Sequence, residues 1–423
     1  MSLHPLQQLA LDHHAGKRRG VTSVCSAHPV VIEAALCLSM ASGQMALIEA
    51  TCNQVNQDGG YTGMTPADFR DFVHAIADRI GLPRAQILLG GDHLGPNPWK
   101  HLPAAQAMAK AEVMIAEYAA AGFTKLHLDC SMGCLNEPEA LGDAEAARRA
   151  AALAVVAEGT AQGDHPPVYV IGTEVPVPGG AAHALDHLAL TTPEAALTTY
   201  EVHRAAFAAV GAEAAFSRVI ALVVQPGVEF GHSDVIHYHR GRAEALSGTL
   251  AQLPGLIFEA HSTDYQTEQG LRALVEDGFA ILKVGPWLTY VLREALYGLD
   301  ALADVLDGSV PQHRLMAAME AVMRAAPGNW QKYYAGSEAD LFQQRHFSYS
   351  DRIRYHWPDP RAQEAVAALA SRLEGKALPA PLVSQYLPVA AESADAAQIK
   401  AVSDVLRLYQ RACSGDGSLS PGP

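Results

Sequence analysis

One pattern recurs along the first two thirds of this 423-residue chain: a short apolar run, a polar or Gly-rich break, and then a helical pattern. The runs are continuous rather than alternating, as in Val219-Ile-Ala-Leu-Val-Val224, which predicts strands buried on both faces of a parallel sheet. Eight strands alternating with helices over about 250 residues are typical of a (β/α)8 TIM barrel, the fold class that we predict. The predicted strands are residues 21–27, 46–51, 86–91, 125–129, 168–172, 219–224, 256–259 and 280–284.

The segments between these strands carry clear helix start signals. Thr65, Pro66 and Asp68 supply an N-cap, a proline at the first helical position and an acidic first turn. Thr192-Pro193-Glu194 repeats this start further along the chain. Both segments are therefore predicted to be barrel helices.

A doubly wound open sheet is the alternative architecture. An open sheet of this length usually carries a Gly-rich phosphate fingerprint after its first strand, whereas here that strand runs into Cys25-Ser-Ala-His28. A Walker motif is missing as well, because Gly16-Lys17 is followed by Arg18 and lacks the preceding glycine spacing. The open sheet and a sugar-kinase activity are therefore both poorly supported.

Beyond Gly285 the strand–helix pattern gives way to helices and an aromatic, charged stretch. Residues 288–306 and 312–324 have helical patterns, and Pro327-Gly-Asn-Trp330 is typical of a break. We predict three parts: a barrel over residues 1–326, a helical and aromatic appendage packed on it over residues 327–412, and a flexible tail over residues 413–423.

Composition and charge narrow the function classes. With 49% hydrophobic residues, the chain can bury a large core. A net charge of -15 and the lack of a Lys/Arg run argue against a nucleic-acid partner. Residues 1–20 lack the apolar core of a signal peptide, and no run of about 18 uncharged apolar residues occurs, so we expect a cytoplasmic protein without a membrane partner. The six cysteines form no CxxC pair and are expected to be reduced.

Polar side chains gather where the predicted strands end, which is where a barrel of this kind builds its active site. Carboxylates, imidazoles and amides in such numbers suit a divalent cation such as Zn²⁺, Mn²⁺, Ni²⁺ or Mg²⁺, with positions left open for a substrate. The residues at these ends are His28, Glu49, Asn53, Asp92, His93, Asp129, Glu174, Gln225, Glu259, His261 and Lys283.

The combination favours chemistry at a sugar carbonyl. A bound cation can polarise the carbonyl during C–C cleavage or proton abstraction. Asp92 is placed to move the proton of the hydroxyl beyond the bond that breaks, as retro-aldol chemistry requires. Asp129 and Glu174 are also predicted to act in catalysis, with ion pairs across the barrel mouth as their alternative role. A Schiff base on Lys283 is a less favoured alternative, and Cys130 is expected to be packing rather than nucleophile.

Five short motifs carry a resemblance to a known family. In order they are Gly-Gly-Asp92-His93, His127-Leu-Asp129-Cys-Ser131, Gly172-Thr-Glu174, Glu259-Ala-His261-Ser-Thr and Leu282-Lys283-Val-Gly. This order resembles the class II, metal-dependent ketose-bisphosphate aldolases. With Ser348-Tyr-Ser-Asp351-Arg352-Ile-Arg354-Tyr in the C-terminal part, the chain more closely resembles the non-catalytic subunits of tagatose-bisphosphate aldolase, the GatZ/KbaZ family.

The resemblance implies roles for the polar strand ends. It implies that Asp92 is the proton donor and that His93 and His261 are metal ligands. The third aldolase ligand, a histidine after the sixth strand, has no clear counterpart, and Gln225 or His232 would fill its place.

The phosphate-binding end departs from the aldolase pattern. Asp264 would repel a phosphate in the loop after the seventh strand, and Pro286 removes a backbone donor after the eighth. Arg352 and Arg354 are an alternative clamp, with a solvated or ion-paired role equally open. The predicted substrate-binding residues are Glu49, Asn53, Ser262, Asp264, Lys283, Arg352 and Arg354.

Two functions compete. The resemblance implies a non-catalytic subunit that supports a class II D-tagatose-1,6-bisphosphate aldolase in galactitol or amino-sugar catabolism. The density of candidate ligands instead favours a stand-alone metal-dependent 4-epimerase or aldolase that acts on an unphosphorylated ketose or keto-acid. The expected ligand is a sugar or sugar phosphate, and the expected protein partner is an aldolase subunit or a second copy of this chain.

Overall fold

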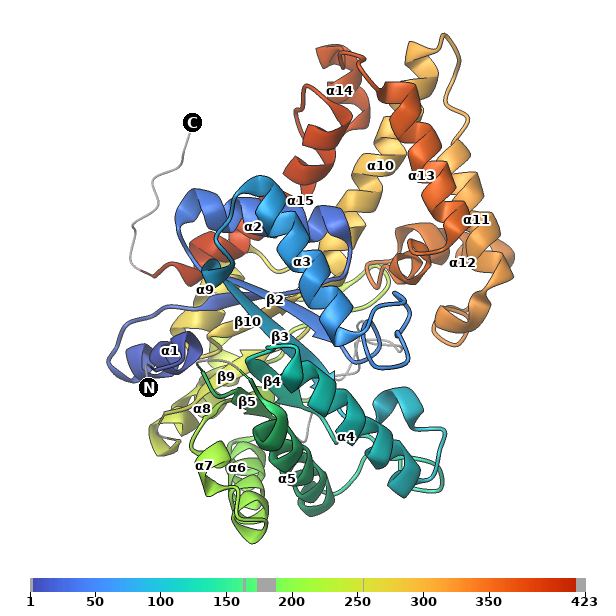
Figure 1. The fold of residues 1–423 in the computed structure, drawn as a ribbon. Helices are drawn as coiled ribbons and strands as arrows, with labels where there is room; N and C mark the ends of the chain where they lie inside the picture. The colour runs from blue at the N-terminus through green and yellow to red at the C-terminus, as the bar shows by residue number, and fades with distance from the viewer. Residues whose placement is uncertain (1–2, 163–164, 173–187, 254, 416–423) are drawn as a thin grey trace.

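The computed structural model describes residues 3–162, 165–172, 188–253 and 255–415, and within them eight parallel strands close into a barrel (Figure 1). The strand order is β1-β10-β9-β6-β5-β4-β3-β2. This confirms the predicted TIM barrel. The barrel strands are β1 (Val21–Cys25), β2 (Ala46–Thr51), β3 (Ile87–Leu94), β4 (Lys125–Leu128), β5 (Val168–Ile171), β6 (Val219–Val224), β9 (Ile257–Ala260) and β10 (Ile281–Val284), and a hairpin of β7 (Glu229–Phe230) and β8 (Val235–Ile236) follows β6.

Helices cover the outside of the barrel and begin at the predicted signals. The Thr65 hydroxyl accepts from the Asp68 backbone, and the Asp68 carboxylate accepts from the Thr65 backbone, a complete capping box before Pro66. The helices are α1 (Pro5–His14), α2 (Pro29–Ser42), α3 (Pro66–Ile80), α4 (Ala104–Ala120), α5 (Asp143–Thr160), α6 (Pro193–Ala209), α7 (Glu213–Phe216), α8 (Arg240–Gly248), α9 (Glu268–Glu276), α10 (Pro286–Leu306), α11 (Arg314–Ala325), α12 (Glu338–Phe347), α13 (Pro360–Leu373), α14 (Ala380–Tyr386) and α15 (Ala394–Cys413).

The amino end of the barrel is closed by apolar packing. Leu6 and Ala10 of α1 are buried against inward-facing strand residues such as Val170 and Ile257. This plug leaves the carboxyl ends of the strands as the open, polar end of the barrel.

The C-terminal helices leave the barrel and then return to it. In Figure 1, α10, α11, α13 and α14 form a group beyond the barrel, whereas α15 comes back and packs against α2, α9 and β1. Helix α10 follows the last barrel strand but extends away from the barrel. Helix α15 therefore takes the place between α9 and α2 in the layer of helices around the barrel. The division of the chain at residue 326 stays a prediction.

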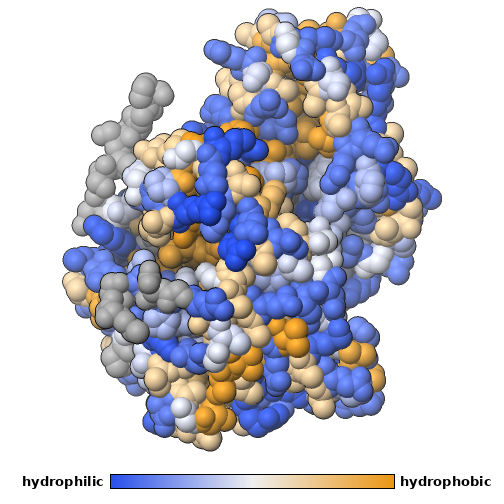
Figure 2. All heavy atoms as spheres, in the orientation of Figure 1, coloured by the Kyte–Doolittle hydropathy of each residue, from blue (hydrophilic) through white to orange (hydrophobic). Residues whose placement is uncertain are grey.

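Among the described residues, no helix is long and apolar enough to span a bilayer. Figure 2 shows polar and apolar side chains intermixed over this face of the molecule.

The return of α15 predicts a measurable contribution to stability. The buried Tyr409 hydroxyl donates to the Thr263 carbonyl at 2.7 Å, in the loop that follows β9. We expect Tyr409→Phe to lower the free energy of unfolding by about 1–2 kcal/mol, because a buried carbonyl loses its donor. Urea denaturation checks this, with Tyr200→Phe on α6 as the control, expected to change stability by less than about 0.5 kcal/mol. Equal effects of the two variants would contradict the prediction.

Candidate active site

A bulge at the end of β3 brings two neighbouring side chains to the same place. The sequence predicts a strand over residues 86–91, but β3 continues to Leu94, with a register shift against β4 after Gly91. His93 has a φ of 50°, a left-handed conformation that re-aims its side chain. Asp92 and His93 would point to opposite faces of a regular strand, yet both are fully buried at the barrel mouth. The sequence prediction ends the strand too early because the residues around Asp92 are polar and Gly-rich, as in a turn. The bulge places a turn-like conformation inside the strand.

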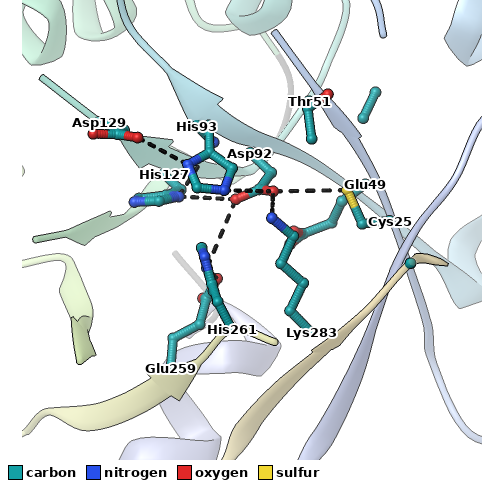
Figure 3. A network of polar contacts seen from close by, with 12 residues as sticks. Cys25, Glu49, Thr51, Asp92, His93, His127, Asp129, Glu259, His261 and Lys283 are labelled. Carbon is teal, nitrogen blue, oxygen red and sulfur yellow. Dashed lines mark hydrogen bonds and ion pairs between the residues drawn. The ribbon is translucent and has the colours of Figure 1, made fainter. Parts of the chain in front are cut away.

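The carboxylate of Asp92 lies at the centre of the buried polar network (Figure 3). His127 Nδ1 lies 2.8 Å from it, His93 Nε2 3.7 Å and His261 Nε2 3.9 Å, and Lys283 Nζ forms an ion pair with it. Burial raises the pKa of the Asp92 carboxyl, but His93, Lys283 and the His127 hydrogen bond together hold it well below its usual range. The group is therefore a buried carboxylate held in its charged form.

The three imidazoles face one another around this carboxylate. Their ring centroids are 4.9–5.3 Å apart. Burial lowers the pKa of His93 below its ordinary value and that of His261 to about 3, which favours the neutral imidazole, the form that binds a cation. Carboxylates orient two of the rings: Asp129 lies 2.8 Å from His93 Nδ1, and Glu259 lies 3.0 Å from His261 Nε2.

These donors fit a divalent cation. Ligand atoms of Asp92, His127, Glu259 and His261 all lie within 4.8 Å of one another. Ligands bound to a single zinc ion at about 2.0–2.2 Å lie within roughly 4.4 Å of each other, so only a small closure is needed. Among the described residues, the buried nitrogens His93 Nε2, His127 Nε2 and His261 Nδ1 have no hydrogen-bond partner, as expected of a site that takes a further ligand.

A second buried ion cluster lies deeper in the barrel. Lys125 Nζ on β4 lies 2.7 Å from Glu49 on β2 and 2.8 Å from Glu259 on β9, and all three side chains are fully buried. Burial raises the pKa of Glu259, but Lys125 and His261 lower it to about 2. Gly90 makes room for this cluster, because a Cβ there would come within 2.6 Å of the Glu49 carboxyl. Glu259 joins the two layers, since it contacts both Lys125 and His261.

Comparison with known proteins decides the family. The family described as D-tagatose-1,6-bisphosphate aldolase subunit GatZ/KbaZ-like matches residues 6–414. The chain belongs to the GatZ/KbaZ-like family. It is 52% identical over 420 residues to the D-tagatose 6-phosphate 4-epimerase of Agrobacterium fabrum, with 97% of this chain and 99% of that protein covered.

Two examples illustrate the solved structures that are similar to this GatZ/KbaZ-like protein. One is described as a probable tagatose 6 phosphate kinase from Sinorhizobium meliloti 1021; it is 59% identical, has a TM-score of 0.87, and the match covers 93% of this chain and all of that one. The other is the glycerol-bound fructuronate-tagaturonate epimerase UxaE from Cohnella laeviribosi, 13% identical with a TM-score of 0.51 over 93% of this chain and 82% of that one. At that identity the second likeness shows the fold alone.

The structure gathers some of the predicted site residues and separates others. Asp92, His93, Asp129, His261 and Lys283 lie together in the network of Figure 3. Glu49 lies in the deeper cluster with Lys125. Glu174 lies outside the described residues.

We call Asp92, His127, Glu259 and His261 the donor group. Neither candidate for the third metal ligand belongs to it. The Gln225 side-chain oxygen accepts from the backbones of Gly227 and Val228, which folds the turn after β6. His232 Nδ1 lies 3.0 Å from the Ser348 hydroxyl. The donor group instead includes His127 of β4.

The predicted substrate-binding residues beyond the network do not share one location. Asn53 and Ser262 lie in the loops after β2 and β9, with Ser262 directly after His261 at a φ of 53°. Arg352 stacks its guanidinium 3.2 Å over the Tyr333 ring and donates to the Asn329 carbonyl, so it is built into the appendage.

Two further predicted substrate-binding residues, Asp264 and Arg354, carry opposite charges and have different contacts. Asp264 accepts from the backbones of Gly285 and Trp287 at the start of α10, and burial raises its pKa to about 6. Arg354 lines a cavity of about 490 Å³ beside the network. Of the two arginines, Arg354 lines this cavity, whereas Arg352 packs on Tyr333.

The sequence analysis gave no role to Lys125 or to His127, although His127 opens one of the quoted motifs and a signal was present. In a strand, residues two apart point to the same side, so Lys125, His127 and Asp129 form an inward polar row in an otherwise apolar run. Charged residues in a run that must be buried are informative, because they need partners across the barrel.

The donor group predicts how metal binding depends on single side chains. We expect His127→Ala and His261→Ala each to weaken retention of a divalent cation by more than about 100-fold, since both remove a candidate ligand. Metal content after dialysis, measured by mass spectrometry, checks this, with the exposed His237→Ala as the control. Wild-type metal content in both variants would contradict the assignment.

The deeper cluster predicts a large stability effect. Lys125→Met would leave two buried carboxylates without their cation, so we expect a loss of about 3–5 kcal/mol in the free energy of unfolding. Adding Glu49→Gln should recover part of this loss, because one of the unpaired charges is removed. Thermal and urea unfolding measure both, and a fully additive double variant would show that the pair is not coupled.

Proposed function

We propose that this protein is a divalent-metal-dependent sugar-phosphate 4-epimerase that interconverts D-tagatose 6-phosphate and D-fructose 6-phosphate by retro-aldol chemistry. The observation that carries the proposal is the buried Asp92 carboxylate inside a group of metal-binding donors. The 52% identity to a D-tagatose 6-phosphate 4-epimerase over nearly the whole chain supports the choice of substrate. That identity favours a phosphorylated sugar over the unphosphorylated ketose or keto-acid.

The chain supplies the proton transfers of the reaction. Asp92, held as a carboxylate by Lys283, accepts the proton of the C4 hydroxyl as the C3–C4 bond breaks. The electron pair of that bond passes to the three-carbon fragment as an enediolate, and an aldehyde forms at C4. The aldehyde turns its other face to C3, the bond re-forms, and Asp92 returns the proton to the new hydroxyl. A cation bound by the other members of the group, His127, Glu259 and His261, would supply Lewis-acid polarisation of the C2 carbonyl and leave Asp92 to take the proton.

Burial of the site suits this chemistry. Asp92, His93, His127 and Glu259 are at most 1% exposed, so water has little access to the reacting carbons. Exclusion of water protects an enediolate from protonation and strengthens the electrostatic contacts around it. The aldehyde is therefore retained long enough to rotate and add back.

The proposal predicts a specific isotope result. With Mn²⁺ or Zn²⁺ added, NMR should show D-tagatose 6-phosphate and D-fructose 6-phosphate interconverting, with deuterium at C4 retained, because the C4–H bond is never broken. Asp92→Asn should lower kcat by about 10²–10⁴-fold through loss of the proton acceptor. The exposed Asp71→Asn is the matched control. Loss of the C4 label to solvent would exclude a retro-aldol route.

The family description keeps a second candidate function in view. The matched family is described as an aldolase subunit, which favours a protein that supports a class II D-tagatose-1,6-bisphosphate aldolase. That function predicts no turnover by the purified chain and an increase in the activity or half-life of the aldolase. If the purified chain converts the substrate and His261→Ala abolishes this activity, the protein is an enzyme and not a supporting subunit.

A further inference from the structure

A cavity of about 490 Å³ lies directly beside the catalytic network. Its wall includes the loops after β1 and β2 and one side of α13. Cys25 forms part of that wall, and its thiol lies 3.6 Å from the Asp92 carboxylate. Gly285, two residues beyond Lys283, also lines it. A molecule whose reacting carbons lie at Asp92 can therefore extend into this space.

Arg354 brings to the cavity a positive charge that is balanced only at longer range, by the carboxylates of Asp351 and Asp264. Its guanidinium donates to the carbonyls of Ser350 and Asp351 and to the Tyr355 hydroxyl. Among the described residues, no carboxylate lies within ion-pair distance of it. By contrast, the buried Arg293 and Arg345 pair with carboxylates. An arginine in a cavity that has no anion in contact with it is suited to bind one from a ligand.

The nearby carboxylates are already engaged with other groups. Asp351 pairs with Arg293 at 3.4 Å and accepts from the Thr289 hydroxyl at 2.6 Å. These contacts fix the segment that carries Arg354, a 3-10 helix over Arg352–His356, against α10. The C-terminal helices thereby hold Arg354 at the barrel mouth.

The usual phosphate position of a barrel is closed in this protein. TIM barrels often bind phosphate with the loops after the last two strands and a helix N-terminus. Here the Asp264 carboxylate already accepts the backbone N–H groups of Gly285 and Trp287 at the start of α10. A phosphate at that point would meet a carboxylate, so the anion of a substrate needs another site.

We propose that the 6-phosphate of the sugar binds in this cavity, with Arg354 as its ion-pair partner. This inference rests on the proposed function and adds the group that selects phosphorylated sugars. Ser26 and Tyr61 line the same cavity, and their hydroxyl groups are further candidates to contact phosphate oxygens. The cavity has the size of an ordinary small-molecule site.

The test measures binding separately from turnover. In the full-length Asp92→Asn protein with Zn²⁺, calorimetry gives the Kd of D-tagatose 6-phosphate and of D-tagatose. The preference for the phosphorylated sugar is the ratio of these two Kd values. We expect Arg354→Met, introduced into this Asp92→Asn protein, to reduce the preference by about 10–100-fold, and Arg354→Lys to reduce it less. Arg361→Gln, an exposed arginine that pairs with Asp359, is the matched control, expected within about 2-fold.

Two variants of Gln363 test the same subsite in case Arg354→Met does not fold. Gln363 is exposed on α13 at the edge of the cavity. Gln363→Glu should lower the preference for the phosphorylated sugar and Gln363→Lys should raise it, each by about 2–5-fold and less at high salt. An unchanged preference in a folded Arg354→Met protein, or equal shifts in the Gln363 pair, would overturn the subsite.

The outcomes separate the subsite from the reaction. Phosphate-dependent binding through Arg354 without epimerisation by the wild type would leave the subsite and remove the epimerase. Epimerisation by the wild type, with a preference for the phosphorylated sugar that does not depend on Arg354, would leave the epimerase and remove the subsite.

Discussion

The buried negative charge of Asp92 is the constraint around which the barrel mouth is built. An ionised carboxylate without solvent is very costly unless cations and donors surround it. Those partners come from separate strands: His127 from β4, His261 from beyond β9 and Lys283 from β10. Only a closed barrel brings these strands together, so closure and charge compensation depend on each other. The same crowding of nitrogen and oxygen donors makes the position suited to a cation.

The fold supports this charge from below and from above. Below it, Lys125 and two glutamates form a second buried layer that shares Glu259 with the site, and α1 closes the base with apolar side chains. Above it, α15 holds the loop after β9 through Tyr409. The returning helix α15 is thus part of the architecture of the barrel mouth.

Aldolase-type and epimerase-type chemistry are close at this site, because both begin by breaking the same C–C bond. An aldolase releases the aldehyde, whereas a 4-epimerase working by retro-aldol retains it and adds it back on the other face. Retention is favoured by a buried site and by a group that holds the far end of the substrate. Arg354 in its cavity has the charge and the position to be that group.

The sequence by itself determined the local features. Apolar runs, N-caps such as Thr65 and the polar pair Asp92-His93 are encoded within a few residues, so eight strands and part of the site were predictable. The tertiary structure alone decided the partners. Lys125 meets Glu259 across 134 residues and Tyr409 meets Thr263 across 146; such contacts depend on strand register, barrel closure and the return of α15. His127 became part of the site for the same reason, because its place among the donors is set by the bulge in β3 and the pairing of β3 with β4.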